Sequence, residues 1–194
     1  MQDIELEQAV EVLLAHTVPV AETERVPLLD AVGRVASEDV CAGFDNPPFD
    51  RSPLDGYTFA AASTANASAE HPVTLRVIGE ECAGDFFAGT VGAGECVRIM
   101  TGGAIPKGCD CVVRQEDVQE DGERIHVPFT SEPYENYCYA GEDIKKDTVL
   151  IRRGQRIRAA HLAVLASEGY GDVLVRRRVR VAVASTGDEL LQPG

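Results

Sequence analysis

Residues 49–57 form the first segment whose side chains could do chemistry. Asp50 and Asp55 supply two carboxylates, Arg51 a guanidinium and Ser52 a hydroxyl, and Gly56 follows directly. Carboxylates can hold a cation or move a proton, and a guanidinium can bind an anion. An Asp-Gly pair is also a common turn, because both residues tolerate turn conformations. A turn and a binding loop are therefore both open interpretations of this segment.

Three further segments carry polar groups that could take part in a site. Thr101 is followed by two glycines, and a turn of this kind could receive an anionic oxygen on its exposed amides and hydroxyl. Asp143 lies in a Gly-Glu-Asp-Ile segment, where a helix cap or a loop ion pair would explain it equally well. Asp188 and Glu189 follow an apolar run, where their oxygens could hold Mg²⁺ or Asp188 could cap a helix.

The charge of the chain is strongly acidic but unevenly distributed. The formal net charge is −14, which argues against general binding to nucleic acid or to anionic lipid. Residues 145–180 nevertheless hold ten of the eighteen Lys and Arg residues and only three acids. This basic stretch indicates either solvated faces and ion pairs between subunits or local attraction of an anionic substrate.

Neither a membrane protein nor a disulfide scaffold is indicated. No apolar run approaches the ~20 residues of a membrane span, and the first residues lack the pattern of a signal peptide. We therefore expect a soluble cytoplasmic protein. Its six cysteines are then expected to be reduced thiols, and their spacing predicts no structural metal site.

The elements expected before residue 48 are mainly helical. Apolar spacing predicts an amphipathic helix over 4–16, which Asp3 could cap. An extended piece over 23–28 and a short helix over 29–35 follow. Two consecutive prolines at 47 and 48 then end any regular element, because neither can donate a backbone hydrogen bond.

Short strands and glycine turns dominate the middle of the chain. Alternation predicts a strand over 73–77, and further strands are expected over 95–100 and 111–115. A hairpin is expected over 118–127, with Asp-Gly at its turn, and 60–69 is expected to be a loop or a weak helix. The pattern indicates a small barrel or sandwich of about 90 residues.

The carboxyl-terminal part returns to mixed structure. An extended stretch with a turn is expected over 149–157, a helix over 159–168 and strands over 172–175 and 179–184. The last strand leads into a polar turn that contains glycine, which is how an open α/β domain begins. One strand cannot bury a core, so we expect the chain to be a piece of a longer protein.

The four polar segments resemble, in their order, the motifs of the molybdopterin molybdenumtransferase family, which includes the MoeA proteins and the corresponding domain of gephyrin. Asp-x-Ser-x-x-Asp-Gly-Tyr begins at residue 50, Arg-Ile-Met-Thr-Gly at 98, Gly-Glu-Asp-Ile at 141 and Ser-Thr-Gly-Asp-Glu-Leu at 185. The similarity extends over essentially the whole chain, including the lengths between the motifs.

The resemblance implies an α+β fold and a division into domains. Residues 1–44 and 140–178 would form a discontinuous, elongated dimerisation region made of helices and strands. Residues 45–139 would form an inserted, small, barrel-like β domain. Residues 179–194 would begin a truncated α/β domain that binds molybdopterin. Asp55, Thr101, Asp143 and Glu189 match catalytic positions of the family, and Arg51, Ser52 and Asp188 are expected to bind substrate.

The implied function is the insertion of molybdate into adenylylated molybdopterin with release of AMP, assisted by Mg²⁺ in a homodimer. An upstream molybdopterin adenylyltransferase would supply the substrate, and the 194-residue chain alone is expected to be inactive. The loop before Gly141 departs from the family, because it has Cys138 where an arginine is common. Arg51 is expected to restore that charge. The alternative is a dimerisation or scaffold module of the same family without catalysis.

Overall fold

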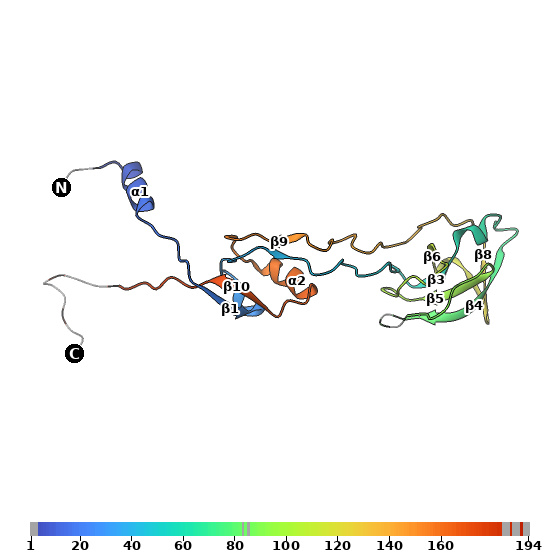
Figure 1. The fold of residues 1–194 in the computed structure, drawn as a ribbon. Helices are drawn as coiled ribbons and strands as arrows, with labels where there is room; N and C mark the ends of the chain where they lie inside the picture. Colours follow the sequence, from blue (N-terminus) through green and yellow to red (C-terminus); the bar gives the residue numbers. More distant parts are fainter. Residues whose placement is uncertain (1–3, 83, 85, 184–186, 188–190, 192–194) are drawn as a thin grey trace. The chain divides into compact units, whose positions relative to one another are not determined.

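The computed structural model describes residues 4–82, 84, 86–183, 187 and 191, which fall into two compact units (Figure 1). The terminal unit combines Met1–Cys41 with Val149–Gly194, and the inserted unit is Ala42–Thr148. The sequence places the insert at 45–139, so the observed unit is longer at both boundaries. Residues 140–148 belong to it because they bond to 42–47: the Ala42 N–H donates to the Thr148 carbonyl, at 2.9 Å.

Two antiparallel ribbons join the distant chain segments of the terminal unit. Strand β1 (Thr23–Pro27) pairs with β10 (Asp172–Arg176) over five residues, and β2 (Val40–Cys41) pairs with β9 (Val149–Ile151). The extended segment predicted over 23–28 and the strand predicted over 172–175 are confirmed as β1 and β10. The extended stretch predicted over 149–157 forms a strand only at β9, and a turn that contains Gly154 follows.

Helix α2 (Ala159–Ser167) completes the terminal unit and confirms the helix predicted there. It buries Leu165 against the ribbons and against the 3₁₀ turn η1 (Leu28–Ala31). The buried core consists of Val26, Leu28, Ala31, Ala36, Val40, Ile151, Ile157, Leu165, Val173 and Val175. Burial of this apolar surface holds residues 26–40 and 151–175 together.

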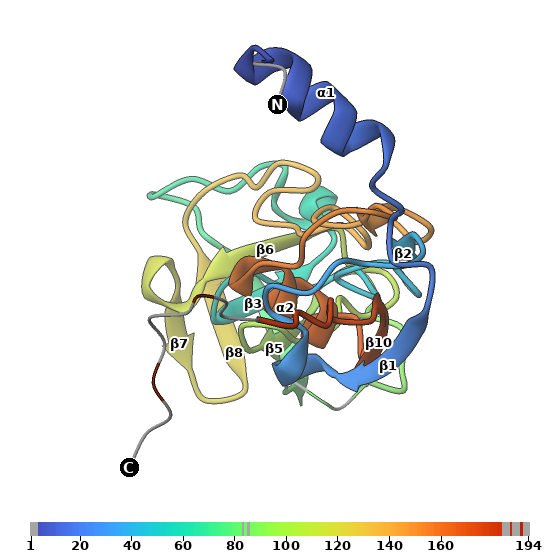
Figure 2. The same ribbon diagram turned by 90° about the vertical axis from the view of Figure 1, so that its left-hand side faces the viewer.

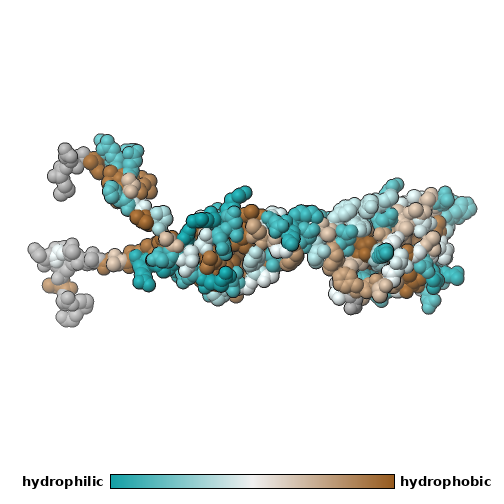
Figure 3. Space-filling view, in the orientation of Figure 1, coloured by the Kyte–Doolittle hydropathy of each residue, from teal (hydrophilic) through white to brown (hydrophobic). Residues whose placement is uncertain are grey.

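Helix α1 (Leu6–Ala15) confirms the predicted amphipathic helix, but none of its residues is buried. Its amino-terminal cap is Glu5, and the expected cap, Asp3, lies outside the described residues. Leu6, Leu13 and Leu14 are about 70% exposed, and Figure 3 shows hydrophobic and hydrophilic residues on this helix. An apolar face of this kind is a feature of helices that pack against another surface.

Two predictions for the terminal unit were wrong. The helix expected over 29–35 is only the single turn η1, because Gly33 takes a φ of +81° and turns the chain away. The strand expected over 179–184 is absent at 179–183, where Val181 and Val183 are almost fully exposed. β-Branched residues favour a strand only when a neighbouring strand pairs with them, and no described segment does so here.

The inserted unit is built on a six-stranded sheet in the order β6-β3-β5-β4-β8-β7. Its strands are β3 (Gly56–Phe59), β4 (Val73–Glu81), β5 (Glu95–Ile99), β6 (Cys111–Arg114), β7 (Gln119–Asp121) and β8 (Arg124–Val127). All neighbours are antiparallel except β4 and β5. The predicted hairpin is confirmed as β7–β8, with Gly122 in its turn (Figure 2).

This sheet curls, because its two edge strands are almost consecutive in sequence. Only residues 115–118, which include the 3₁₀ turn η3 (Gln115–Asp117), separate β6 from β7. The Tyr57 hydroxyl in β3 donates a 2.7 Å hydrogen bond to Glu120 in β7, four strands away in the sheet order. The curled sheet encloses a core of Tyr57, Phe59, Ala61, Leu75, Cys96, Cys111, Val113, Ile125 and Val127.

Strand β3 was not predicted, and its four residues are all buried. A strand buried on both faces lacks the alternation of apolar and polar residues by which strands are recognised. Gly56 begins it because a Cβ at this position would lie 1.8 Å from the Val113 carbonyl oxygen. The short 3₁₀ turn η2 (Ala61–Thr64) follows, in the region expected to be a loop or a weak helix.

Neither α1 nor α2, the helices within the described ranges, has the length and apolar character needed to cross a membrane. All six cysteines are free thiols, and Cys96 and Cys111 are buried in the core of the inserted unit.

Candidate functional site

Asp55 and Thr101 meet at one end of the curled sheet. Asp55 directly precedes β3 and Thr101 follows β5, and these antiparallel neighbours place Gly56 opposite Ile99. The Thr101 backbone N–H and hydroxyl donate hydrogen bonds of 2.7 and 2.8 Å to Oδ1 of Asp55. Two candidate residues from separate sequence segments are therefore in direct contact.

These contacts keep the Asp55 carboxylate ionised. Its pKa is lowered from the usual 3.8, mainly by the Thr101 N–H and then by the Thr101 hydroxyl, with weaker attraction from Arg98. Hydrogen bonds donated to the charged form of an acid favour that form. At neutral pH Asp55 is consequently a negative charge and a hydrogen-bond acceptor, and it has no proton to donate.

A hollow of about 360 Å³ lies beside this pair. Asp55 and Thr101 line it together with Pro53, Leu54, Arg114 and Glu116. Arg114 ends β6, where it pairs with Gly56 in the register of β3. Arg114 and Glu116 were not predicted as site residues. The signal that could have found them is the change from the apolar Val112-Val113 pair to polar residues, which indicates the end of a strand, as at Thr101.

A second hollow of about 300 Å³ shares Pro53 and Thr101 with the first and is also lined by Arg51, Ser52, Gly102 and Cys138. Ser52 is 1% exposed. Its hydroxyl donates a 2.5 Å hydrogen bond to the Leu54 carbonyl and accepts one of 3.2 Å from the Leu54 N–H. These contacts shape the turn that leads to Asp55, so Ser52 positions this carboxylate.

Arg51 links Asp143 to the second hollow. Its backbone exchanges hydrogen bonds of 2.9 and 3.1 Å with Cys138, and its Nη2 lies 3.7 Å from Oδ2 of Asp143. The Asp143 side chain is 62% exposed. The guanidinium thus comes from the residue whose backbone pairs with Cys138.

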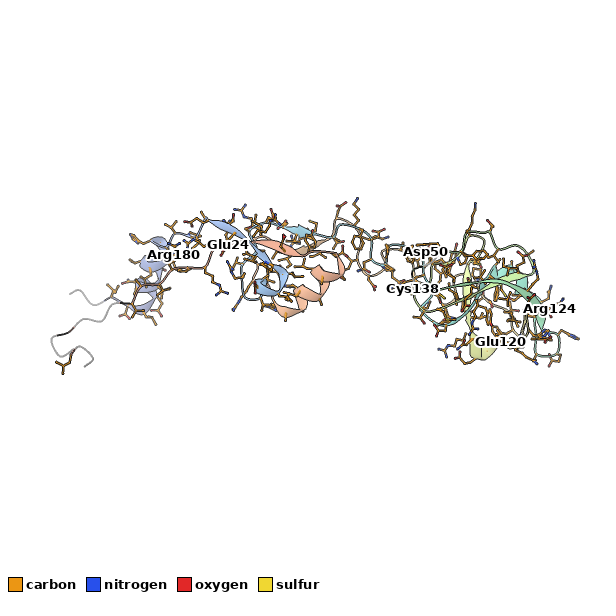
Figure 4. The ribbon with its side chains drawn as sticks, turned by 90° about the horizontal axis from the view of Figure 1, so that it is seen from below. Glu24, Asp50, Glu120, Arg124, Cys138 and Arg180 are labelled. Carbon is orange, nitrogen blue, oxygen red and sulfur yellow. The ribbon has the colours of Figure 1, made fainter. Side chains whose placement is uncertain are left out.

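Asp50 holds the loop that carries Cys138 in place. Its Oδ2 accepts a 2.6 Å hydrogen bond from the Tyr137 hydroxyl, and its Oδ1 accepts one of 2.8 Å from the Ala140 N–H. Figure 4 shows Asp50 and Cys138 at one end of the inserted unit. Both Asp50 carboxylate oxygens are therefore used to fasten this loop.

Asp188 and Glu189, the remaining candidate residues, lie outside the described residues. Within 4–82, 84, 86–183, 187 and 191, no three His, Cys, Asp or Glu side chains are grouped so that they could hold a metal ion. The site around Asp55 can supply a carboxylate ligand but not a complete protein cage. Mg²⁺ is commonly bound through one or two carboxylates and substrate phosphates, and Asp55 fits that mode.

Carboxylates and guanidinium groups both line the two hollows. Asp55 carries a negative charge in the first hollow, which Arg114 also lines, and Arg51 lines the second. Arginine binds phosphate and other oxyanions through its planar fork of donors. The first hollow thus carries two carboxylates, those of Asp55 and Glu116, beside Arg114, and the second carries Arg51, which could bind an oxyanion.

Comparison with known proteins identifies the family to which the chain belongs. The family model described as MoeA N-terminal region (domain I and II) matches residues 4–169. A molybdopterin molybdenumtransferase of Bacillus subtilis is 39% identical over 182 residues, which are 92% of this chain and 42% of that protein. One of Staphylococcus epidermidis is 33% identical over 189 residues, 97% of this chain and 45% of that protein.

Solved structures show the same likeness. A molybdopterin biosynthesis MoeA protein of Pyrococcus horikoshii OT3 has a TM-score of 0.82 and 39% sequence identity, and the match covers 88% of this chain and 45% of that one. A second structure of a MoeA protein from the same species has a TM-score of 0.80 at 34% identity. The chain spans less than half the length of these curated relatives.

Proposed function

The chain belongs to the MoeA N-terminal family, and from this premise we propose that it forms the amino-terminal part of a molybdopterin molybdenumtransferase. The reaction is the insertion of molybdate into adenylylated molybdopterin with release of AMP. The relatives bear the name of this activity, and the chain matches them over nearly its whole length.

The observation that carries the proposal is the contact between Asp55 and Thr101 beside two hollows. The Thr101 N–H and hydroxyl both donate to Asp55. The Thr101 hydroxyl oxygen can therefore only accept a hydrogen bond from a ligand. Asp55 is ionised and can therefore accept hydrogen bonds or hold a cation beside the substrate. The pair acts as one acceptor surface that orients the substrate.

The positive charges of Arg51 and Arg114 are opposite in sign to those of the substrates. Molybdate and adenylylated molybdopterin are anions, and Arg51 and Arg114 would draw them to the hollows despite the overall charge of −14. Arg51 takes the part of the base that the family commonly has at position 138, and Asp143 orients its guanidinium. For Asp188 and Glu189 we propose roles in substrate binding and in catalysis, respectively, because they match the fourth motif of the family.

Magnesium remains part of the proposal, with Asp55 as one carboxylate ligand. The ion would neutralise phosphate charge when bound between this carboxylate and the substrate. Electrostatics supports such a cation, because a carboxylate that faces an anionic substrate would otherwise repel it.

We also propose that the protein is a cytoplasmic homodimer and that a molybdopterin adenylyltransferase supplies its substrate. The exposed apolar face of α1 supports the dimer, because helices with such a face usually bury it against another surface. A measurement of the molar mass in solution, with Leu13→Lys as a variant that disrupts this face, tests the dimer separately from the chemistry.

A chimera tests the activity. The 194-residue chain replaces the matched region of the Bacillus subtilis relative, and AMP release is followed with adenylylated molybdopterin, molybdate and Mg²⁺. We expect release by the chimera, at least tenfold less by its Asp55→Asn variant, and none by the 194-residue chain alone. Asp121→Asn in β7 is the matched control and should keep the activity. A folded chimera whose Asp55→Asn variant is fully active would refute the role of Asp55.

A scaffold module is the second candidate, favoured by the absence of a base between residues 136 and 140. A folded chimera that forms the oligomer of its relative but releases no AMP would support it. The arginine paired with Cys138 favours the enzyme, because it brings a positive charge back to the second hollow.

A further inference from the structure

Five arginines surround one pocket of the terminal unit, which has a volume of about 420 Å³. Arg34, Arg156, Arg176, Arg177 and Arg178 line it, and none of the other lining residues is acidic. Backbone pairing brings them together: the Ile157 N–H donates to the Arg34 carbonyl and the Arg176 N–H donates to the Val35 carbonyl, each at 2.8 Å. We call this feature the arginine pocket.

Part of the charge in the arginine pocket is neutralised. Arg34 is 8% exposed and is ion-paired with Glu24, and it also donates a 2.8 Å hydrogen bond to the Arg176 carbonyl. Arg177 lies 3.5 Å from Glu22. Two carboxylates thus oppose five guanidinium groups, which leaves three positive charges in excess.

Two of the three excess charges, those of Arg156 and Arg178, lie where a ligand could reach them, whereas the half-buried Arg176 guanidinium donates to the Ala21 carbonyl. Arg156 and Arg178 are exposed, and within the described part of the chain neither has a carboxylate within ion-pair distance. The Arg156 guanidinium lies against Gly33, where a Cβ would be 3.5 Å from its Nη2. The absence of a side chain at Gly33 lets this group lie close to the backbone beside the buried Arg34.

We propose that the arginine pocket binds a multiply charged phosphate-type oxyanion. Guanidinium groups bind phosphate oxygens through charged, often bidentate hydrogen bonds, and a bound anion would relieve the repulsion among the excess charges. The volume lies within the range of small-ligand sites. The site is built from the terminal unit alone, so this proposal does not depend on the transferase chemistry proposed for the inserted unit.

Calorimetric titration of the 194-residue chain with sodium pyrophosphate tests the proposal. A parallel titration with AMP shows whether the pocket prefers a free phosphate anion or the phosphate of a nucleotide. Binding of either probe supports the site. We also expect the affinity to fall when the NaCl concentration rises from 0.05 to about 0.5 M, because salt screens exposed charges. No binding of either probe at low salt would overturn the proposal.

Variants locate the binding. We expect Arg156→Ala and Arg178→Ala each to weaken it by roughly tenfold, since a hydrogen bond to a charged group contributes about that factor or more. Arg25→Ala is the control, because it removes an exposed guanidinium of the same unit that lies outside the pocket and is paired with Asp172. Unfolding curves verify that each variant is folded. Equal affinity in Arg156→Ala, Arg178→Ala and Arg25→Ala would place any binding elsewhere and overturn the assignment.

Discussion

The Thr101 hydroxyl and the Thr101 backbone N–H both donate to a single oxygen of Asp55, Oδ1, at 2.8 and 2.7 Å. One residue thereby fixes the orientation and the charge of the carboxylate. Because the backbone donor remains in every variant of residue 101 except proline, the contribution of the hydroxyl can be measured separately.

We predict that Thr101→Val raises the pKa of Asp55 toward 3.8, because it removes the hydroxyl donor, whereas Thr101→Ser leaves it low. A carboxyl titration by NMR measures the shift. The lowered pKa also means that the pair stabilises the fold above pH 3.8, and that this stabilisation is lost as the pH falls through the pKa of folded Asp55. An identical Asp55 pKa in Thr101→Val and the unmodified chain would contradict this role of the hydroxyl.

Gly56→Ala should lower the free energy of unfolding of the inserted unit by at least about 2 kcal/mol, because overpacking forces the backbone of β3 away from β6. The added Cβ would lie 1.8 Å from the Val113 oxygen. Urea denaturation measures the change. Gly43→Ala, where a Cβ meets no atom within 4 Å, is the control and should change stability by less than about 1 kcal/mol.

Arg51→Ala in the chimera should reduce AMP release roughly tenfold at subsaturating molybdate, because the charge beside Cys138 is lost. Its stability should change by less than about 1 kcal/mol, because the 3.7 Å pair with Asp143 is exposed. Arg124→Ala in β8 removes a charge outside both hollows and should retain activity. Unchanged release by Arg51→Ala would mean that Arg51 does not replace the missing base.

Tyr57 should make the inserted unit sensitive to alkaline pH. Burial, and then the hydrogen bond to Glu120, raise the pKa of Tyr57 to about 12. The unfolded chain releases this proton near the ordinary value of 10, so the contribution is complete below pH 10 and is lost as the pH rises toward 12. Tyr57→Phe should remove this part of the decline, which unfolding curves between pH 8 and about 11 measure. An unchanged decline would show that other groups cause it.

The cysteines should differ in their reaction with a thiol reagent. Cys82 is exposed, whereas burial raises the pKa of Cys96 and of Cys111 to about 12. Since the thiolate is the reactive form, we expect Cys82 to be modified in the native protein and Cys96 and Cys111 only after unfolding. Mass spectrometry of peptides from native and urea-treated protein assigns the sites. Early modification of Cys96 would indicate that the curled sheet opens readily.

The sequence by itself determined the elements whose signals are local. Helical spacing predicted α1 and α2, alternation predicted β4, and the Asp-Gly turn predicted the β7–β8 hairpin. The ordered polar motifs also predicted the family. Each of these signals depends only on neighbouring residues or on their order along the chain.

The tertiary structure decided what depends on distant partners. Strand β3 exists because β5 and β6 pair with it on both sides, whereas no strand in the described part of the chain pairs with the valine-rich residues 179–183, which are irregular. The same pairing of β3 with β5 brings Asp55 to Thr101, 46 positions apart. Backbone pairing between distant segments likewise gathers the basic residues around the arginine pocket. Strand pairing depends on which backbone hydrogen-bonding groups face each other, and no short stretch of sequence contains that information.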